Sequence, residues 1–140
     1  MTIKLADGTK LRRDFKLPEE DVECLNALGF KWETVAEGST KWLIIHDYPI
    51  PGGYNHGTAD LALRMPPSYP DDQIDMVYFH PALVLTSGKA IRQLSGLTID
   101  GKGYQQWSRH RTPENPWRPG LDNVGTHLLQ ADDWLQRELK

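Results

Sequence analysis

The hydrophobic and polar positions of this chain repeat with two different periods. From Thr58 to Met65 every second residue is apolar, and this period of two predicts a half-buried strand. Near the C-terminus the apolar residues return every three or four positions, which predicts a helix with one buried stripe. The stripe consists of Leu121, Val124, Leu128, Ala131 and Leu135. We therefore expect a sheet packed against helices.

A shorter helix is predicted near the N-terminus. Leu17-Pro18 and the acids of Glu19 to Asp21 open it, because proline is tolerated in a first turn and acids suit the positive end of the helix dipole. Gly29 is a typical C-terminal stop. Its apolar face would consist of Val22, Leu25 and Leu28. The charged residues before it, 1–16, are expected to form a loose arm or a weak hairpin.

Strands are expected between the two helices, separated by proline and glycine clusters. The expected strands are 31–36, 41–48, 58–65 and 74–79, followed by a hairpin over 82–98 that turns at 86–89. The segments 100–103 and 104–120 are expected to be a loop and an irregular stretch. The predicted fold class is α+β, with an N-terminal helix, a four-stranded antiparallel meander and a C-terminal helix packed on the sheet. The predicted organisation is an arm, 1–16, and one domain, 17–140.

Composition narrows the class of protein. A chain of 140 residues with 39% hydrophobic and 25% charged residues is typical of one globular domain. The net charge of −3 and the lack of a basic cluster argue against a nucleic-acid partner. No apolar run approaches the roughly 20 residues of a membrane span, and no signal peptide is visible in 1–16. The cytoplasm is therefore the expected compartment.

The number of cysteines and the spacing of the histidines predict no metal site and no cofactor. The single cysteine, Cys24, excludes an internal disulfide and a cysteine-rich zinc site. It is expected to be a buried small hydrophobe on the first helix. The five histidines lack the spacing of metal ligands, so no metal site is predicted.

The residues with the most suggestive chemistry lie between two tryptophans, Trp107 and Trp117. Ser108 stands directly before Arg109 and His110. A hydroxyl nucleophile, an imidazole base and a cationic oxyanion donor are the parts that acyl transfer needs. The same residues also fit a simpler interpretation, a turn serine within a solvated basic loop. Residues alone leave both interpretations open.

The order of the motifs between the predicted elements resembles that of E2 ubiquitin-conjugating proteins. The matching motifs, in order, are Trp42, Gly53-Tyr54-Asn55-His56-Gly57, Pro66-Pro67-Ser68-Tyr69-Pro70, His80-Pro81 and Pro116-Trp117-Arg118-Pro119. Their order is similar to the family's glycine-rich loop, P-x-x-Y-P turn, H-P-N motif and W-S-P motif. The chain looks most like the prokaryotic E2 family E, across roughly residues 17–135. The resemblance implies the UBC fold.

The resemblance also implies a function. It places Ser108 at or near the nucleophile position, where E2 enzymes have cysteine, with His110 and Arg109 in supporting catalytic roles. His80, Trp117 and Tyr69 would support the site structurally. The chain would then accept a ubiquitin-like protein from an E1-like activating enzyme as a serine oxyester and transfer it to an amine of a protein substrate.

Two departures from the E2 pattern suggest an alternative. Cysteine is missing near Ser108, and Ala82 stands where the family has the asparagine of H-P-N. These departures favour a catalytically inactive E2 variant that only binds a ubiquitin-like protein or an E1. A third hypothesis is an unrelated α+β binding domain.

Overall fold

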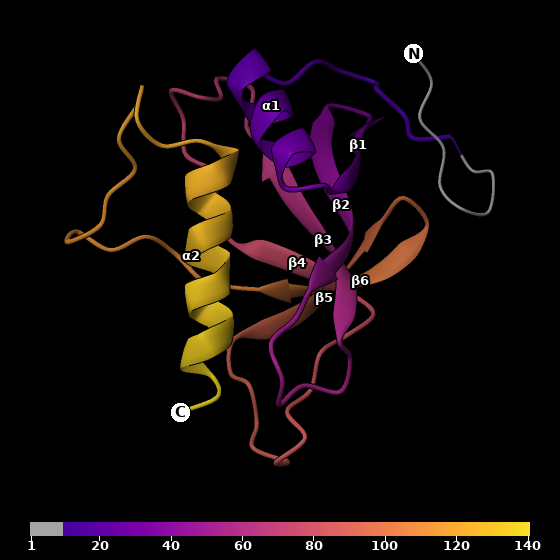
Figure 1. The fold of residues 1–140 in the computed structure, drawn as a ribbon, viewed down its shortest axis with the longest axis vertical. Coiled ribbons are helices and arrows are strands. Elements are labelled where there is room, and N and C mark those ends of the chain that lie inside the picture. The colour runs from indigo at the N-terminus through magenta and orange to yellow at the C-terminus, as the bar shows by residue number, and fades with distance from the viewer. Residues whose placement is uncertain (1–9) are drawn as a thin grey trace.

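Two helices and six strands are found in residues 10–140, the part of the chain that the structure, a computed structural model, describes (Figure 1). The elements are α1 (Glu19–Ala27), β1 (Lys31–Glu37), β2 (Thr40–Pro49), β3 (Thr58–Met65), β4 (Val77–His80), β5 (Leu94–Ile99), β6 (Lys102–Trp107) and α2 (Val124–Arg137). The strands form one antiparallel sheet in the order β1-β2-β3-β4-β6-β5. This is an α+β fold with the general UBC-like layout. Residues 1–9 of the expected loose arm or weak hairpin, 1–16, lie outside the described residues.

The predicted antiparallel meander is present as β1 to β4, but the predicted count of four strands is wrong, because the β5–β6 hairpin extends the sheet to six strands. The predicted hairpin over 82–98 does not form; residues 81–93 instead carry the chain from β4 to the far edge of the sheet, where β5 begins. β6 then returns between β4 and β5. The expected loop at 100–103 is a tight turn of Asp100 and Gly101, which have φ angles of 53° and 74°. An Asp-Gly pair with positive φ is the typical two-residue hairpin turn, so β5 and β6 pair directly.

The inner face of the sheet packs against α2, which Figure 1 shows in yellow alongside the strands. The alternation of β3 is confirmed: Ala59, Leu61, Leu63 and Met65 are all buried in this core. The stripe of α2 is confirmed from Val124 to Leu135, and each fully buried leucine or valine stabilises the fold by about 1.5–3 kcal/mol. Leu121 is 64% exposed because it precedes the helix.

Local capping explains where α2 begins. The side chain of Asn123 accepts a hydrogen bond from the Thr126 backbone N–H at 3.0 Å, and the Thr126 hydroxyl accepts one from the Asn123 backbone N–H at 3.0 Å. This reciprocal capping box satisfies two amide groups that a helix start leaves unpaired. In α1, Leu25 is fully buried, but Leu28 is 57% exposed because the helix ends one residue earlier.

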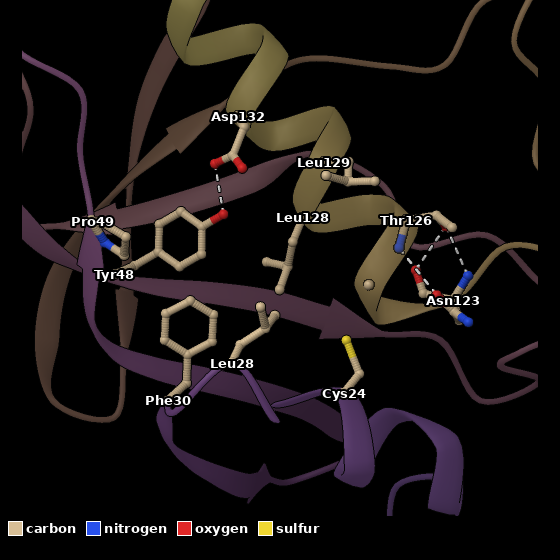
Figure 2. A pocket seen from close by; sticks show the side chains of 11 residues that line it. Cys24, Leu28, Phe30, Tyr48, Pro49, Asn123, Thr126, Leu128, Leu129 and Asp132 are labelled. Carbon is tan, nitrogen blue, oxygen red and sulfur yellow. Dashed lines mark hydrogen bonds between the residues drawn. The ribbon is translucent and has the colours of Figure 1, made fainter. Parts of the chain in front are cut away.

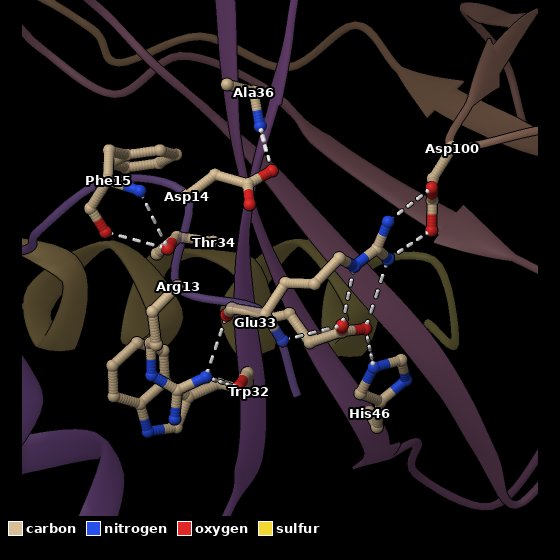
Figure 3. A network of polar contacts seen from close by, with 10 residues as sticks. Arg13, Asp14, Phe15, Trp32, Glu33, Thr34, Ala36, His46 and Asp100 are labelled. Carbon is tan, nitrogen blue, oxygen red and sulfur yellow. Dashed lines mark hydrogen bonds and ion pairs between the residues drawn. The ribbon is translucent and has the colours of Figure 1, made fainter. Parts of the chain in front are cut away.

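A polar network holds the segment before α1 to the sheet (Figure 3). The guanidinium of Arg12 donates to Glu33 at 2.9 Å and to Asp100 at 2.5 Å, which joins residues from β1 and the β5–β6 turn. His46 of β2 contacts Glu33 at 2.7 Å and Asp60 at 3.3 Å. The carboxylate of Asp60, together with that of Glu33, raises the pKa of His46.

Candidate functional site

The segment of interest leaves the sheet at the end of β6. Trp107 is fully buried, its ring packs edge-to-face on Phe79, and its Nε1–H donates to the side chain of Gln105 at 2.8 Å. Ser108 follows directly and is half-buried. Its backbone N–H donates to the Gln93 carbonyl at 3.0 Å, and its hydroxyl oxygen accepts from the Gln106 side-chain amide at 3.4 Å. The position of Ser108 is therefore fixed by backbone pairing at the sheet's end.

Arg109 turns toward the C-terminal end of α2. Its guanidinium forms an ion pair with Glu138 at 2.9 Å and lies over the Trp107 ring at 5.1 Å from the centroid. The side chains of Arg109 and Glu138 are only 16% and 20% exposed. Because the Arg109 guanidinium is already paired with a carboxylate and is mostly buried, Arg109 in this arrangement holds the loop to the end of the helix.

His110 turns to a different partner. Its Nδ1 lies 2.9 Å and 3.0 Å from the two carboxylate oxygens of Asp75, in the segment before β4. The imidazole is 62% exposed. Within residues 10–140 no hydrogen bond joins His110 to the Ser108 hydroxyl. The structure therefore brings the three predicted catalytic residues into one loop but gives each side chain a separate partner.

His80 lies at the end of β4, some distance from Ser108. Its Nδ1 is 2.7 Å from the Gly103 carbonyl, and its ring packs on Tyr104. In the β4–β6 ladder Val77, the first residue of β4, pairs with Trp107, the last residue of β6. Ser108 therefore lies beyond the start of β4, whereas His80 lies at its end. At roughly 3.3 Å per residue, four positions along β6 separate the two sites by about 13 Å.

Tyr69 and Trp117 connect the loops to the helices. The Tyr69 hydroxyl donates to the buried carboxylate of Asp21 at 2.6 Å and accepts from the Val124 backbone N–H at 3.0 Å. Burial, followed by the hydrogen bond to Asp21, raises the pKa of Tyr69. Trp117 donates from Nε1 to the Pro70 carbonyl at 3.0 Å. Both residues thus join the proline-rich turn before β4 to the region where α2 begins.

The sequence interpretation gave no role to two side chains that shape the segment after His80-Pro81. Asn55 donates to the Ala82 carbonyl at 3.2 Å and accepts from the Val84 backbone N–H at 2.9 Å. Gln105 accepts from the Leu83 backbone N–H at 3.0 Å. Asn55 belongs to the glycine-rich motif that resembles the E2 pattern, and this motif could have drawn attention to it. Gln105 lies in none of the matching motifs, so the sequence offered no indication of its role. Ala82 itself is exposed and offers no side-chain donor.

An apolar pocket lies between α1, β2 and α2 (Figure 2). Its volume is about 440 Å³, and its apolar lining residues include Phe30, Leu128 and Leu129. The prediction that Cys24 is buried is wrong: the thiol is half-buried because it borders this pocket. At the other end the Tyr48 hydroxyl donates to Asp132 at 2.6 Å. The pocket is distinct from the Ser108 segment.

No group of three or more histidine, cysteine or acidic residues among positions 10–140 is arranged to hold a metal ion. In the same part of the chain, neither helix has the length and apolar character needed to cross a membrane.

Comparison with known proteins identifies the family. The family model of prokaryotic E2 family E matches residues 17–138, a range that includes both helices and all six strands described above. The chain belongs to prokaryotic E2 family E. Membership of this family supports an E2-like role in general, and with it a ubiquitin-like protein or an E1-like enzyme as the kind of partner. No curated protein and no solved structure matches the chain.

Proposed function

We propose that this E2-like chain is a binding module that recognises a ubiquitin-like protein or an E1-like enzyme without forming a covalent bond to it. The observation that carries the proposal is the separation of the supposed catalytic groups. Arg109 is paired with Glu138, and His110 is paired with Asp75. The hydroxyl of Ser108 is left with a long contact to a neutral amide.

The chemistry of serine supports this proposal. A serine hydroxyl is a weak nucleophile near neutral pH and needs an adjacent general base, within about 2.6–3.2 Å, to be activated. The oxyanion of a tetrahedral intermediate needs a donor that is already in place. Ala82 supplies no side-chain amide at the position of the H-P-N asparagine. A chain with this arrangement can retain the partner-binding surfaces of an E2 fold without its acyl transfer.

A second candidate function is a carrier that uses Ser108. The exposed position of His110 favours it, because even a fully charged surface pair contributes only about 0–1 kcal/mol, so exchange of the Asp75 contact for one with Ser108 would cost little. The Ser108 oxygen would attack the C-terminal carbonyl carbon of the ubiquitin-like protein held as a thioester on the E1-like enzyme, and its proton would pass to His110. The carbon–sulfur bond would break, and the E1-like enzyme's thiolate would leave and take up that proton. Arg109 would stabilise the oxyanion. The product would be an oxyester.

One experiment separates the two functions. The protein is mixed with ATP and with the ubiquitin-like protein and E1-like enzyme of the same genome, and noncovalent binding and hydroxylamine-sensitive adducts are measured in parallel. The binding module predicts equal binding by wild type and Ser108→Ala and no adduct from either. Ser95→Ala is the matched control, since Ser95 is an exposed serine on the edge strand β5. An adduct that survives in Ser95→Ala but disappears in Ser108→Ala would overturn the proposal.

A further inference from the structure

A second pocket, about 400 Å³ in volume, lies between α2 and the loop that precedes it. Three arginines line it, together with two aspartates, which leaves one positive charge in excess on a chain whose net charge is −3. The charged residues are Arg111, Arg118, Arg137, Asp122 and Asp133. We name this site the arginine pocket.

Arg111 is the unusual member of the arginine pocket. Its side chain is only 5% exposed and lies over the Trp117 ring at 5.0 Å from the centroid. Its Nε is buried without a hydrogen-bond partner among residues 10–140. The nearest carboxylate oxygen, from Asp122, is 3.6 Å from Nη1, which is longer than a hydrogen bond. A guanidinium has five N–H donors, and burying one unsatisfied is costly.

Asp122 is poorly placed to satisfy Arg111. The same carboxylate oxygen, Oδ2, already accepts the Arg118 backbone N–H at 2.7 Å and also lies 3.6 Å from the Arg118 side chain. Asp133 is occupied by Arg137, at 2.7 Å. Arg118 and Arg137 are 60% and 64% exposed, so both can move toward a bound anion. The arginine pocket therefore combines one buried, under-satisfied guanidinium with two exposed ones.

We propose that the arginine pocket binds a carboxylate from an acidic segment of a partner protein. Guanidinium and carboxylate groups match in plane and spacing, so a carboxylate can take two parallel hydrogen bonds. Leu129 argues for a peptide segment over a free anion. It is 70% exposed, and it lines both the arginine pocket and the apolar pocket beside it. A peptide with an apolar side chain directly before its acidic ones would contact both.

The test is an NMR titration of the whole chain that follows the side-chain Nε–H signal of Arg111. The probe is acetyl-Leu-Glu-Glu-Glu-amide, and its matched control is the glutamine version at the same ionic strength. We expect the glutamate peptide to shift the Arg111 signal and the backbone amides of Thr126 and Gln130 in a saturable manner, and the glutamine peptide to shift none of them. Equal shifts with both peptides, or none with either, would contradict the proposal.

Variants and a second anion make the test specific. Arg118→Ala and Arg137→Ala change exposed side chains, so both should fold, and together they should weaken glutamate-peptide binding at least fivefold. Arg64→Ala, an exposed arginine of β3, should not weaken it. Equal weakening by Arg64→Ala would show nonspecific charge attraction and would overturn the proposal. A response to sodium phosphate without one to the peptide would identify an inorganic anion site and would also overturn it.

Discussion

His127 should make the fold sensitive to acid. Its ring is fully buried between α2 and the segment before β4, and its Nε2–H donates to the Met76 carbonyl at 2.8 Å. Nδ1 has no partner among the described residues, and the ring packs edge-to-face on Trp134. Burial lowers the pKa of His127 to about 4, since a charged imidazole would lose its hydration. The folded protein therefore keeps this histidine neutral.

The size of the effect follows from the two pKa values. The unfolded chain has the ordinary histidine pKa of 6.5, so below that pH it binds a proton that the folded protein does not. Each pKa unit corresponds to about 1.4 kcal/mol, and the full shift therefore corresponds to about 3 kcal/mol. Because the folded pKa is the lower one, this stability is present above pH 6.5 and is lost as pH falls toward 4. At pH 4.5 about 2.5 kcal/mol should be gone.

The assay is urea unfolding of wild type and His127→Gln at pH 7 and pH 4.5. The variant should cost about 1–2 kcal/mol at pH 7 through lost packing. Its further loss on acidification should be about 2.5 kcal/mol smaller than that of wild type, because it cannot take up the proton. His127→Phe should show the same reduced dependence on pH. Parallel pH curves for wild type and both variants would refute the reasoning.

Three further predictions concern the scaffold, all measured as free energies of unfolding. Gly53 has a φ angle of 107°, and a Cβ added there would lie 2.6 Å from Cδ2 of Leu139, so Gly53→Ala should destabilise by about 1–3 kcal/mol, whereas Gly57→Ala, at ordinary φ and in open space, should change little; equal effects would show that neither backbone strain nor this close contact is the cause. Tyr69→Phe should cost about 2 kcal/mol at pH 7 because it removes the hydrogen bond to the buried Asp21 carboxylate, and a neutral result would show that water replaces that bond. His46 has a raised pKa, so its stabilisation is complete below pH 6.5 and is lost as pH rises through that pKa. His46→Gln should therefore cost more at pH 6 than at pH 9, and the reverse order would contradict the ion-pair account.

Local patterns predicted the elements that obey a clear period. The alternation of β3 gave its bounds, and the stripe of α2 gave its buried face, because burial of one face is what imposes those periods. The β5–β6 hairpin was missed although Asp100-Gly101 is a typical turn pair. The neighbouring glycines and the prolines from Pro113 onward suggested a loop instead.

The candidate site depended on contacts that no local pattern specifies. The sequence placed Ser108, Arg109 and His110 side by side, and they do share one loop. Which way each side chain turns depends on Glu138 and Asp75, which lie 29 and 35 positions away in the chain. Ion pairs at such separations follow from the tertiary arrangement, so adjacency in sequence could not predict whether a serine and a histidine act together.

The most direct test of the binding-module account is the intact mass of the chain after incubation with its E1-like enzyme, ATP and ubiquitin-like protein. The account predicts that the mass stays that of the free chain while the partner remains bound under native conditions. A mass increased by one ubiquitin-like protein, lost on treatment with hydroxylamine and absent from Ser108→Ala, would contradict it and would establish Ser108 as the acceptor of an oxyester.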